Sequence, residues 1–152
     1  MILDDIIGLI KMETNLNIVY EEKPEDSAWG IIGRGVGDYN TKKAGDNNFQ
    51  RLCYVLQDSE GVVVGGILGE TYWQWFYVDL LWVSEDLRRQ GFGSQLLEIA
   101  ETEARKRGAK NAYLDTFSFQ SPEFYYKNGF EAFGELDNYP PGSQRFFLRK
   151  SL

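Results

Sequence analysis

The middle of the chain alternates between short apolar runs and turn-forming residues, which is the pattern of consecutive β-strands. Residues 51–57 and 61–68 form two such runs, and the turn sequence DSEG between them predicts a hairpin. Residues 69–71 are expected to connect this hairpin to a third strand, the aromatic and β-branched run 72–83. Three consecutive strands with short connections indicate an antiparallel meander.

After this meander the apolar positions recur at the spacing of a helix. A helix is predicted over 94–107 with Gly108 as its C-cap residue. Two acid–base pairs four residues apart, Glu101 with Arg105 and Glu103 with Arg107, support it. The apolar positions that share its inner face are Leu96, Leu97, Ala100 and Ala104.

The remaining segments predict one α/β domain with a single mixed β-sheet, an antiparallel meander followed by a β-α-β unit, flanked by helices on both faces. A first strand is expected at 16–20, and residues 1–15 are taken as an N-terminal extension of the domain 16–152. Ser27 is expected to cap a helix over 27–40, followed by a loop over 41–48. The later predicted elements are a strand at 111–116, a short helix at 122–128, and strands at 133–136 and 145–149.

Composition narrows the classes of function. The formal net charge of -7 argues against a nucleic-acid partner and is compatible with a cationic substrate such as an amine. No apolar run is long enough to span a membrane, and Asp4 and Asp5 stand where a signal peptide needs positive charge, so we expect a cytoplasmic protein. With no histidine and one cysteine, Cys53, neither a metal cluster nor a cysteine nucleophile is expected.

The junction between strand and helix, VSEDLRRQGFGSQLL, carries the strongest chemical signal. Gly91 and Gly93 allow the backbone to curl tightly, and the positive end of the following helix favours a negative group there. Arg88 adds charge at the rim. A plain glycine-rich turn is the alternative, and a dinucleotide site is weaker because Gln95 or Leu96 stands where a third glycine is needed.

Two motifs together resemble the GNAT superfamily of N-acetyltransferases. Residues 83–93 are similar to that family's pyrophosphate-binding pattern V-x-x-x-x-[RQ]-x-x-G-x-[GA]. Residues 124–130, FYYKNGF, resemble its F-Y-x-K-x-G-F signature. The motifs occur in the family's order, with one helix and one strand between them. The resemblance covers roughly residue 16 to the C-terminus and implies the family's fold and acetyl-CoA as the acetyl donor, with no metal.

The resemblance also implies roles for individual positions. The backbone of the strand end would hydrogen-bond the pantetheine amides, and the N–H groups of the loop and first helical turn would hold the pyrophosphate. Ser118 stands where many members of the family have a cofactor-contacting asparagine, and a serine hydroxyl can also form a hydrogen bond there. The cofactor-binding positions are therefore Leu81, Trp82, Val83, Arg88, Arg89, Gln90, Gly91, Phe92, Gly93, Ser94 and Ser118.

Tyr125 matches the family tyrosine that protonates the leaving thiolate, a role open to a phenol because it is protonated at neutral pH. The amine must also lose a proton, and Asp79 is the first candidate base, with Glu70 at the predicted turn as the second and water as a third route. Strand alternation would surround Asp79 with aromatic side chains, and burial would raise its pKa. An Asp that bonds nearby backbone or sits at a bulge is the alternative. The face predicted for this strand comprises Trp73, Trp75, Tyr77, Asp79, Leu81 and Val83.

The sequence thus predicts an enzyme that passes an acetyl group from acetyl-CoA directly to a primary amine of a small molecule or peptide. A non-catalytic acyl-CoA sensor or interaction module is the first alternative, and a purely structural domain is the second. The aromatic run around 72–82 would form either core packing or a substrate wall. The acceptor is not readable from the sequence, and a homodimer stays open by analogy with the family.

Overall fold

The computed structural model describes residues 16–22 and 26–152, and it divides the chain into two units, Met1–Lys43 and Ala44–Leu152. Helix α1 (Asp26–Ala44) confirms the predicted helix and extends it by four residues into the expected loop. Residues 16–20 form no strand, so that prediction was wrong. Their side chains are exposed, and β-prone sequence becomes a strand only where a partner strand pairs with it. The predicted extension 1–15 lies outside the described residues.

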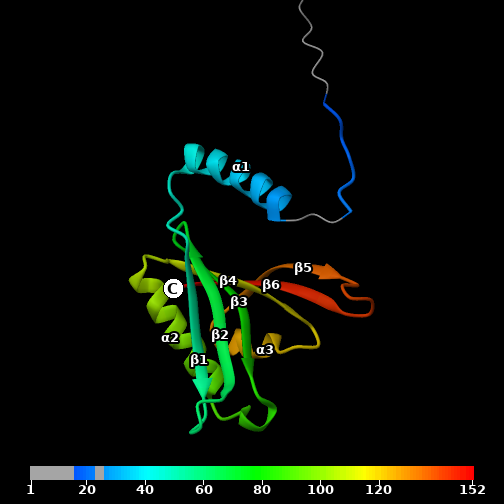
Figure 1. The fold of residues 1–152 in the computed structure, drawn as a ribbon. Helices are drawn as coiled ribbons and strands as arrows, with labels where there is room; N and C mark the ends of the chain where they lie inside the picture. The colour runs from blue at the N-terminus through cyan, green and yellow to red at the C-terminus, as the bar shows by residue number, and fades with distance from the viewer. Residues whose placement is uncertain (1–15, 23–25) are drawn as a thin grey trace, which may run out of the picture. The chain divides into compact units, whose positions relative to one another are not determined.

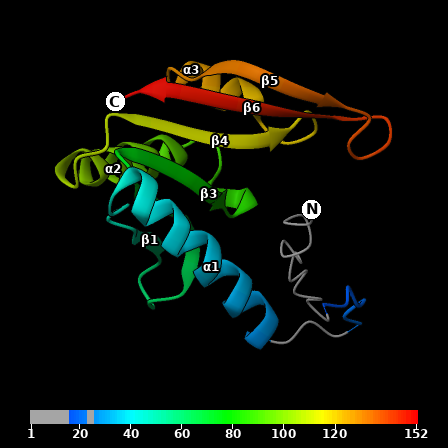
Figure 2. The same cartoon turned by 90° about the horizontal axis from the view of Figure 1, so that it is seen from above.

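The second unit is built on a six-stranded sheet with the order β1-β2-β3-β4-β6-β5 (Figure 1). The strand β4 pairs with β3 in parallel, and every other neighbouring pair is antiparallel. This arrangement confirms the predicted mixed sheet, a meander followed by a β-α-β unit. Figure 2 shows its last three strands, β4, β6 and β5, side by side. The strands are β1 (Gln50–Gln57), β2 (Val63–Tyr72), β3 (Trp75–Val83), β4 (Asn111–Phe117), β5 (Glu131–Asp137) and β6 (Gln144–Ser151).

Helix α2 (Phe92–Lys106) supplies the helical side of the core, and its beginning lies behind β1 and β2 in Figure 1. The four predicted apolar positions are buried, as is Glu101. Both predicted acid–base pairs form, at 3.5 Å for Glu101–Arg105 and 2.9 Å for Glu103–Arg107. The helix packs on strand side chains that are almost fully buried, among them Leu52, Ile67, Phe76, Val78, Leu114 and Leu148.

The meander differs from the prediction at its second turn. Trp73 and Gln74 form a two-residue turn with φ of 42° and 66°, so β2 continues to Tyr72 and Glu70 lies inside a strand. Both angles are left-handed, which is the geometry of a tight hairpin, although neither residue is the glycine or asparagine that signals one. The turn is held from outside: the backbone N–H of Trp73 donates to Asn47 O at 2.9 Å, and Gln74 O accepts from Lys110 N at 2.7 Å.

A β-bulge interrupts β3 at Asp79. Leu68 pairs with Leu80 and Gly69 pairs with Val78, so Asp79 is opposite no residue of β2. Phe76 and Val78 are buried before the bulge. Beyond it the inward positions are Leu81 and Val83, which pack against the core while Asp79, Leu80 and Trp82 are exposed. The single face predicted for this strand was therefore wrong, because one extra residue reverses the alternation.

Gly69 makes the bulge possible. A Cβ added there would lie 2.7 Å from Phe76 Cε2 and would also meet the carbonyl oxygen of Tyr77. Such a contact with backbone cannot be relieved by moving one flexible side chain. Only glycine allows β2 and β3 to approach this closely.

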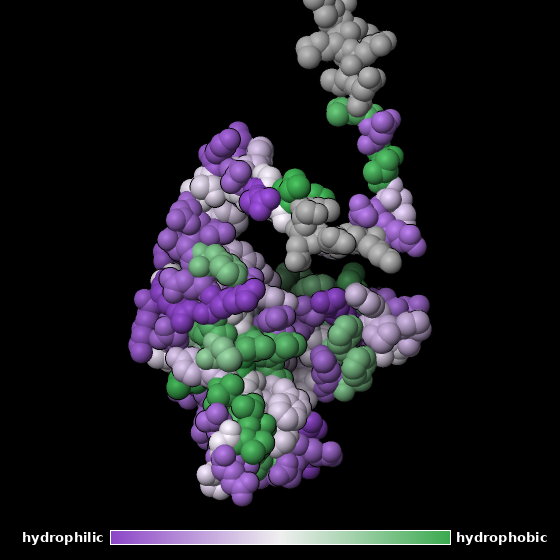
Figure 3. Space-filling view, viewed as in Figure 1, coloured by the Kyte–Doolittle hydropathy of each residue, from purple (hydrophilic) through white to green (hydrophobic). Residues whose placement is uncertain are grey.

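The front of the sheet in Figure 3 carries hydrophobic surface over β1 and β2. The exposed apolar side chains of these strands include Val55 and Leu68, which alternate with the inward positions. Among the described residues, no helix is long and apolar enough to cross a membrane.

Candidate active site

The strands β3 and β4 separate beyond a short stretch of pairing. Their parallel register runs from Trp75 opposite Asn111 to Tyr77 opposite Tyr113. Both strands then continue, to Val83 and Phe117, with no further pair between them in the described sheet. The bulge at Asp79 begins where the pairing ends. The facing backbone groups beyond this point are therefore available to a ligand that offers amide groups of its own.

The loop after β3 leads from this opening to the first turn of α2. Arg88 is exposed, and its Nε donates to Val83 O at 3.0 Å, which fixes the start of the loop on the strand end. Gln90 Nε2 donates to Asp86 O at 3.0 Å. Arg89 and Gly91 have φ of 63° and 89°, so the chain turns sharply before the helix. The loop is thus held by its own side chains while both arginines stay at the surface.

Helix α2 begins at Phe92, two residues earlier than predicted, with Gly91 as its N-cap residue. The first bond of the helix runs from Gln95 N to Gly91 O at 3.0 Å. The N–H groups of Phe92, Gly93 and Ser94 precede this bond and lack intrahelical partners, as in any first helical turn. With the positive end of the helix dipole, these donors form a site suited to a phosphate.

The two positions Gly91 and Gly93 require glycine for different structural reasons. Gly91 is required for its left-handed backbone, with φ of 89°. At Gly93 a Cβ would lie 3.3 Å from the Phe124 ring, so the missing side chain lets α2 approach the short helix α3 (Pro122–Lys127). Both glycines were expected to let the backbone curl tightly beside a negative group, and at Gly93 packing between the helices is an additional cause.

Tyr125 lies on α3 among aromatic side chains. Its ring meets those of Phe124 and Phe130 edge-on, at centroid distances of 5.0 and 5.9 Å. Burial, together with the negative charge of Asp115, raises the pKa of Tyr125 to about 12. The phenol therefore holds its proton at neutral pH and can act as a donor. Tyr126, the neighbouring tyrosine, also packs against the core.

The candidate bases lie differently from the prediction. Asp79 is exposed at the bulge rather than buried on an aromatic face, so the predicted burial was wrong. Glu70 lies in β2 opposite Tyr77, not at a turn. Burial raises the pKa of Tyr77, with further contributions from the charges of Asp115, Asp79 and Glu70. Both predicted bases are therefore near the point where β3 and β4 part.

Ser118 extends the pairing of β4 with β6. Its Oγ accepts from Gln144 N at 3.1 Å, and its own N–H donates to Gln144 O at 2.8 Å. The serine is exposed, so its hydroxyl proton stays available to a ligand. The next turn is held by Gln120, whose Oε1 accepts from Thr116 Oγ1 and Phe117 N, both at 2.9 Å.

An ion pair near the opening was missed by the sequence analysis. Arg145 Nε lies 2.7 Å from Asp115 Oδ2, and the guanidinium stands over the rings of Phe117 and Tyr139 at 5.4 and 5.3 Å. Alternation along 111–117 puts Asp115 on the same face as Tyr113, which is a signal that was available. The partner on β6 could not be read, because its register with β4 is a property of the folded sheet.

The described residues contain no group of three or more metal-ligating side chains placed to hold an ion.

Ser84, at the end of β3, has a buried hydroxyl without a hydrogen-bond partner in the described part of the chain. It lies beside the start of the loop, where its backbone N–H donates to Val64 O at 2.9 Å.

Comparison with known proteins agrees with this geometry. The model of the Acetyltransferase (GNAT) family matches residues 16–130. Acetyltransferase Atu2258 of Agrobacterium fabrum is 33% identical over 135 residues, which cover 89% of this chain and 98% of that protein. Blasticidin-S acetyltransferase of Streptomyces morookaense is 40% identical over 93 residues, covering 60% of this chain and 68% of that protein.

A crystal structure of an acetyltransferase from Bacillus cereus is also similar, with a TM-score of 0.80 and 33% identity. The match covers 88% of this chain and 98% of that one. The chain therefore belongs to the GNAT family of acetyltransferases, whose enzymes use acetyl-CoA. The predicted family and fold class are confirmed.

Proposed function

We propose that this protein is an acetyl-CoA-dependent N-acetyltransferase that passes an acetyl group directly to a primary amine of a small molecule or peptide. The observation that carries the proposal is the opening beyond the Tyr77–Tyr113 pair, which leads to the N–H groups at the start of α2. A linear ligand with amides at one end and phosphates at the other would meet matching backbone groups along this path.

The residues present fit such a donor. The backbone of Leu81, Trp82 and Val83 would bind the pantetheine arm, since it faces the unpaired side of β3. The loop Arg88 to Ser94 would hold the pyrophosphate, with the two arginines adding charge and Ser118 offering its hydroxyl from the turn after β4. Acetyl-CoA supplies the activated acetyl group. The protein contributes position and backbone donors that polarise the thioester carbonyl.

Proton transfer would involve residues on both sides of the opening. Tyr125 would donate to the departing thiolate, because its raised pKa keeps the phenol protonated. Asp79 would accept a proton from the attacking amine, directly or through water, since it is exposed at the bulge beside the opening. Glu70 is the second base, one strand further away.

The first experiment is calorimetric titration of the protein with acetyl-CoA, followed by an amine panel read through release of free thiol. Blasticidin S belongs in the panel because one relative is named blasticidin-S acetyltransferase. Tight binding and turnover on one class of amine are expected. Binding without turnover on any amine would favour the sensor, and failure to bind would contradict the proposal.

The matched test of the phosphate site is Gly91→Glu against Gly61→Glu. Both glycines are left-handed, with φ of 89° and 82°, and Gly61 lies in the β1–β2 turn away from the opening. Gly91→Glu places strain and negative charge at the start of α2 and should abolish acetyl-CoA binding in a folded protein. Gly61→Glu should bind acetyl-CoA normally. Equal binding by both variants would place the phosphates elsewhere.

A further inference from the structure

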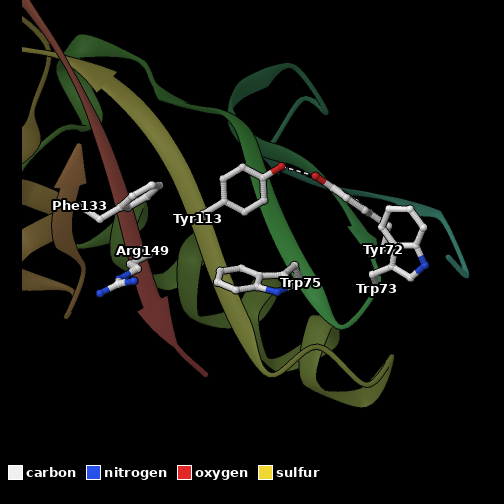
Figure 4. Close-up of a pocket in the computed structure, with 6 residues that line it drawn as sticks. All are labelled: Tyr72, Trp73, Trp75, Tyr113, Phe133 and Arg149. Carbon is white, nitrogen blue, oxygen red and sulfur yellow. Dashed lines mark hydrogen bonds between the residues drawn. The ribbon is translucent and has the colours of Figure 1, made fainter. Parts of the chain in front are cut away.

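A cavity lies on the sheet face away from α2, near the beginnings of β3 and β4 (Figure 4). Its volume of about 470 Å³ is in the range of small-molecule sites. Each lining residue comes from a different strand or from the β2–β3 turn. The lining comprises Tyr72, Trp73, Trp75, Tyr113, Phe133 and Arg149.

The aromatic walls are fixed by contacts with one another. The hydroxyls of Tyr72 and Tyr113 share a hydrogen bond, drawn in Figure 4. Trp75 meets the Tyr113 ring edge-on at 5.9 Å, and Trp73 lies 6.2 Å from the Tyr72 ring. Burial and the bond to Tyr72 raise the pKa of Tyr113, so this wall stays uncharged. Preformed ring surfaces of this kind favour a flat, unsaturated ligand.

Arg149 gives the cavity its charge. The guanidinium stands over the Phe133 ring at 5.7 Å, and its Nε lies 3.0 Å from Glu131 Oε1. The side chains of this pair are 55% and 68% exposed, so the bond to Glu131 contributes little and can be exchanged. A positively charged ligand would be repelled by Arg149, whereas a carboxylate could receive two parallel hydrogen bonds from it.

The cavity is connected to the active site through stacked rings. Tyr113 stacks on Tyr77 at 4.8 Å, and Tyr77 is the last residue of β3 paired with β4. From Trp75 to the bulge at Asp79 the strand rises roughly 13 Å, at about 3.3 Å per residue. A molecule of the size of a small peptide could therefore reach from the cavity to the opening along one face of the sheet.

From these contacts we propose that the cavity binds a flat ring carrying a negative group, as the part of the acceptor remote from its reacting amine. The ring lies against the tyrosine and tryptophan walls, and the negative group binds Arg149. This inference rests on the proposed function, because it assigns the cavity to the acceptor. It also defines a substrate class. Its members carry a planar anionic group separated from the reacting amine by roughly 13 Å, the rise from Trp75 to Asp79.

The probe is 2-naphthoate, a flat anion without an amine to acetylate. Its binding is followed through the indole N–H signals of the four tryptophans, assigned by single Trp→Phe variants. The signals of Trp73 and Trp75 should shift, while those of Trp29 and Trp82 stay in place. The cation 2-naphthylmethylamine and the non-planar anion cyclohexanecarboxylate should each bind at least about fivefold more weakly. Equal binding of all three would overturn the proposal.

Arg149→Gln tests the anionic contact, with Arg51→Gln on exposed β1 as the matched control. Losing a charge-assisted bond should weaken naphthoate binding about tenfold in Arg149→Gln. Arg51→Gln should bind naphthoate with the same affinity as the unsubstituted protein. Arg149 is exposed, so the variant should keep its far-ultraviolet spectrum. Unchanged affinity in Arg149→Gln would contradict the assignment.

Calorimetry with acetyl-CoA separates this inference from the proposed function. Naphthoate should bind equally well with and without saturating acetyl-CoA, because the cavity and the opening are distinct. Displacement of naphthoate by acetyl-CoA would overturn the inference while supporting the donor site. Naphthoate binding in a protein that fails to bind acetyl-CoA would support the cavity and contradict the proposed enzyme.

Discussion

Asp115 and Arg145 join β4 to β6 beside the opening, with 2.7 Å between Oδ2 and Nε. The hydrogen bond to Asp115 raises the pKa of Arg145, so the guanidinium stays charged. The carboxylate also acts across the sheet, since its charge raises the pKa of Tyr125 on α3. A surface ion pair and the proposed proton donor are thus coupled electrostatically.

This coupling predicts that Asp115→Asn lowers the pKa of Tyr125 from about 12, because a negative charge that disfavours the phenolate is removed. The pKa should stay above 10, the ordinary tyrosine value, since burial is the larger cause. Titration of ¹³Cζ-labelled tyrosine by NMR measures the change. Glu70→Gln is the control, because Glu70 acts on Tyr77 and Tyr113 instead. If the pKa of Tyr125 is the same in Asp115→Asn as in the unsubstituted protein, the coupling is refuted.

Alkaline stability provides a second prediction. Because the pKa of Tyr125 is raised on folding, its contribution to stability is complete below pH 10 and is lost as the pH rises through about 12. By pH 11 the loss is about 1.4 kcal/mol, because the pKa is 10 in the unfolded chain and about 12 in the folded protein. Denaturant unfolding at pH 8 and pH 11 should therefore show a smaller decrease for Tyr125→Phe than for the unsubstituted protein. Equal decreases would mean that Tyr125 ionises normally.

Removing the same hydroxyl should also slow acetyl transfer. Tyr125→Phe is expected to reduce turnover about 100-fold with acetyl-CoA affinity nearly unchanged, since a proton donor acts in the transition state rather than in binding. Tyr126→Phe is the matched control and should retain turnover. The measurement is thiol release with the amine identified by the panel. A full rate in Tyr125→Phe would remove the phenol from the mechanism.

The buried pair of Glu101 and Lys150 makes a prediction about stability. The Lys150 Nζ lies 2.9 and 2.8 Å from the two carboxylate oxygens, and the Glu101 side chain is 5% exposed. Lys150→Met leaves this carboxylate without its nearest cation and should cost about 3 kcal/mol in the free energy of unfolding. Lys106 lies 4.0 Å from Glu103 in an exposed ion pair. Lys106→Met should therefore lower the free energy of unfolding by well under about 1 kcal/mol.

The double variant Glu101→Leu with Lys150→Met tests the cause of that loss. Replacing both charges by apolar groups removes the buried carboxylate together with the lysine that neutralises it, so much of the stability should return. Unfolding in urea compares the unsubstituted protein, Lys106→Met, Lys150→Met and the double variant under the same conditions. If the double variant is as unstable as Lys150→Met alone, packing rather than the loss of the nearest cation is responsible.

The parts of the fold that could be predicted are those with a repeating or local signal. The face of α2 follows from the helical spacing of Leu96, Leu97, Ala100 and Ala104, and the loop follows from Arg88 and Gly91. The turn at Trp73 and Gln74 could not be predicted, because neighbours distant in the sequence hold residues that ordinarily avoid left-handed angles.

The same reason limits the prediction of the site. Asp79 was singled out by its residue type, but its exposure depends on the bulge. The bulge in turn requires a glycine at position 69 of the neighbouring strand, beside the Phe76 ring. Part of the aromatic cavity lies in the run 72–82 that was expected to form either core packing or a substrate wall, whereas Tyr113, Phe133 and Arg149 come from later strands and could not be placed beside it. Local patterns marked the proposed donor site, and the folded sheet was needed to assemble the proposed acceptor site.

The bulge in β3 decides which side chains of the strand end face the core. Deleting Asp79 would remove only the extra residue, so Leu81 and Val83 would stay inward while Leu80 and Trp82 stay at the surface. A regular ladder that kept Asp79 paired would instead turn Leu80 and Trp82 inward, and a large indole would have to occupy space now filled by smaller side chains. One residue that leaves the ladder therefore keeps the indole of this strand out of the interior.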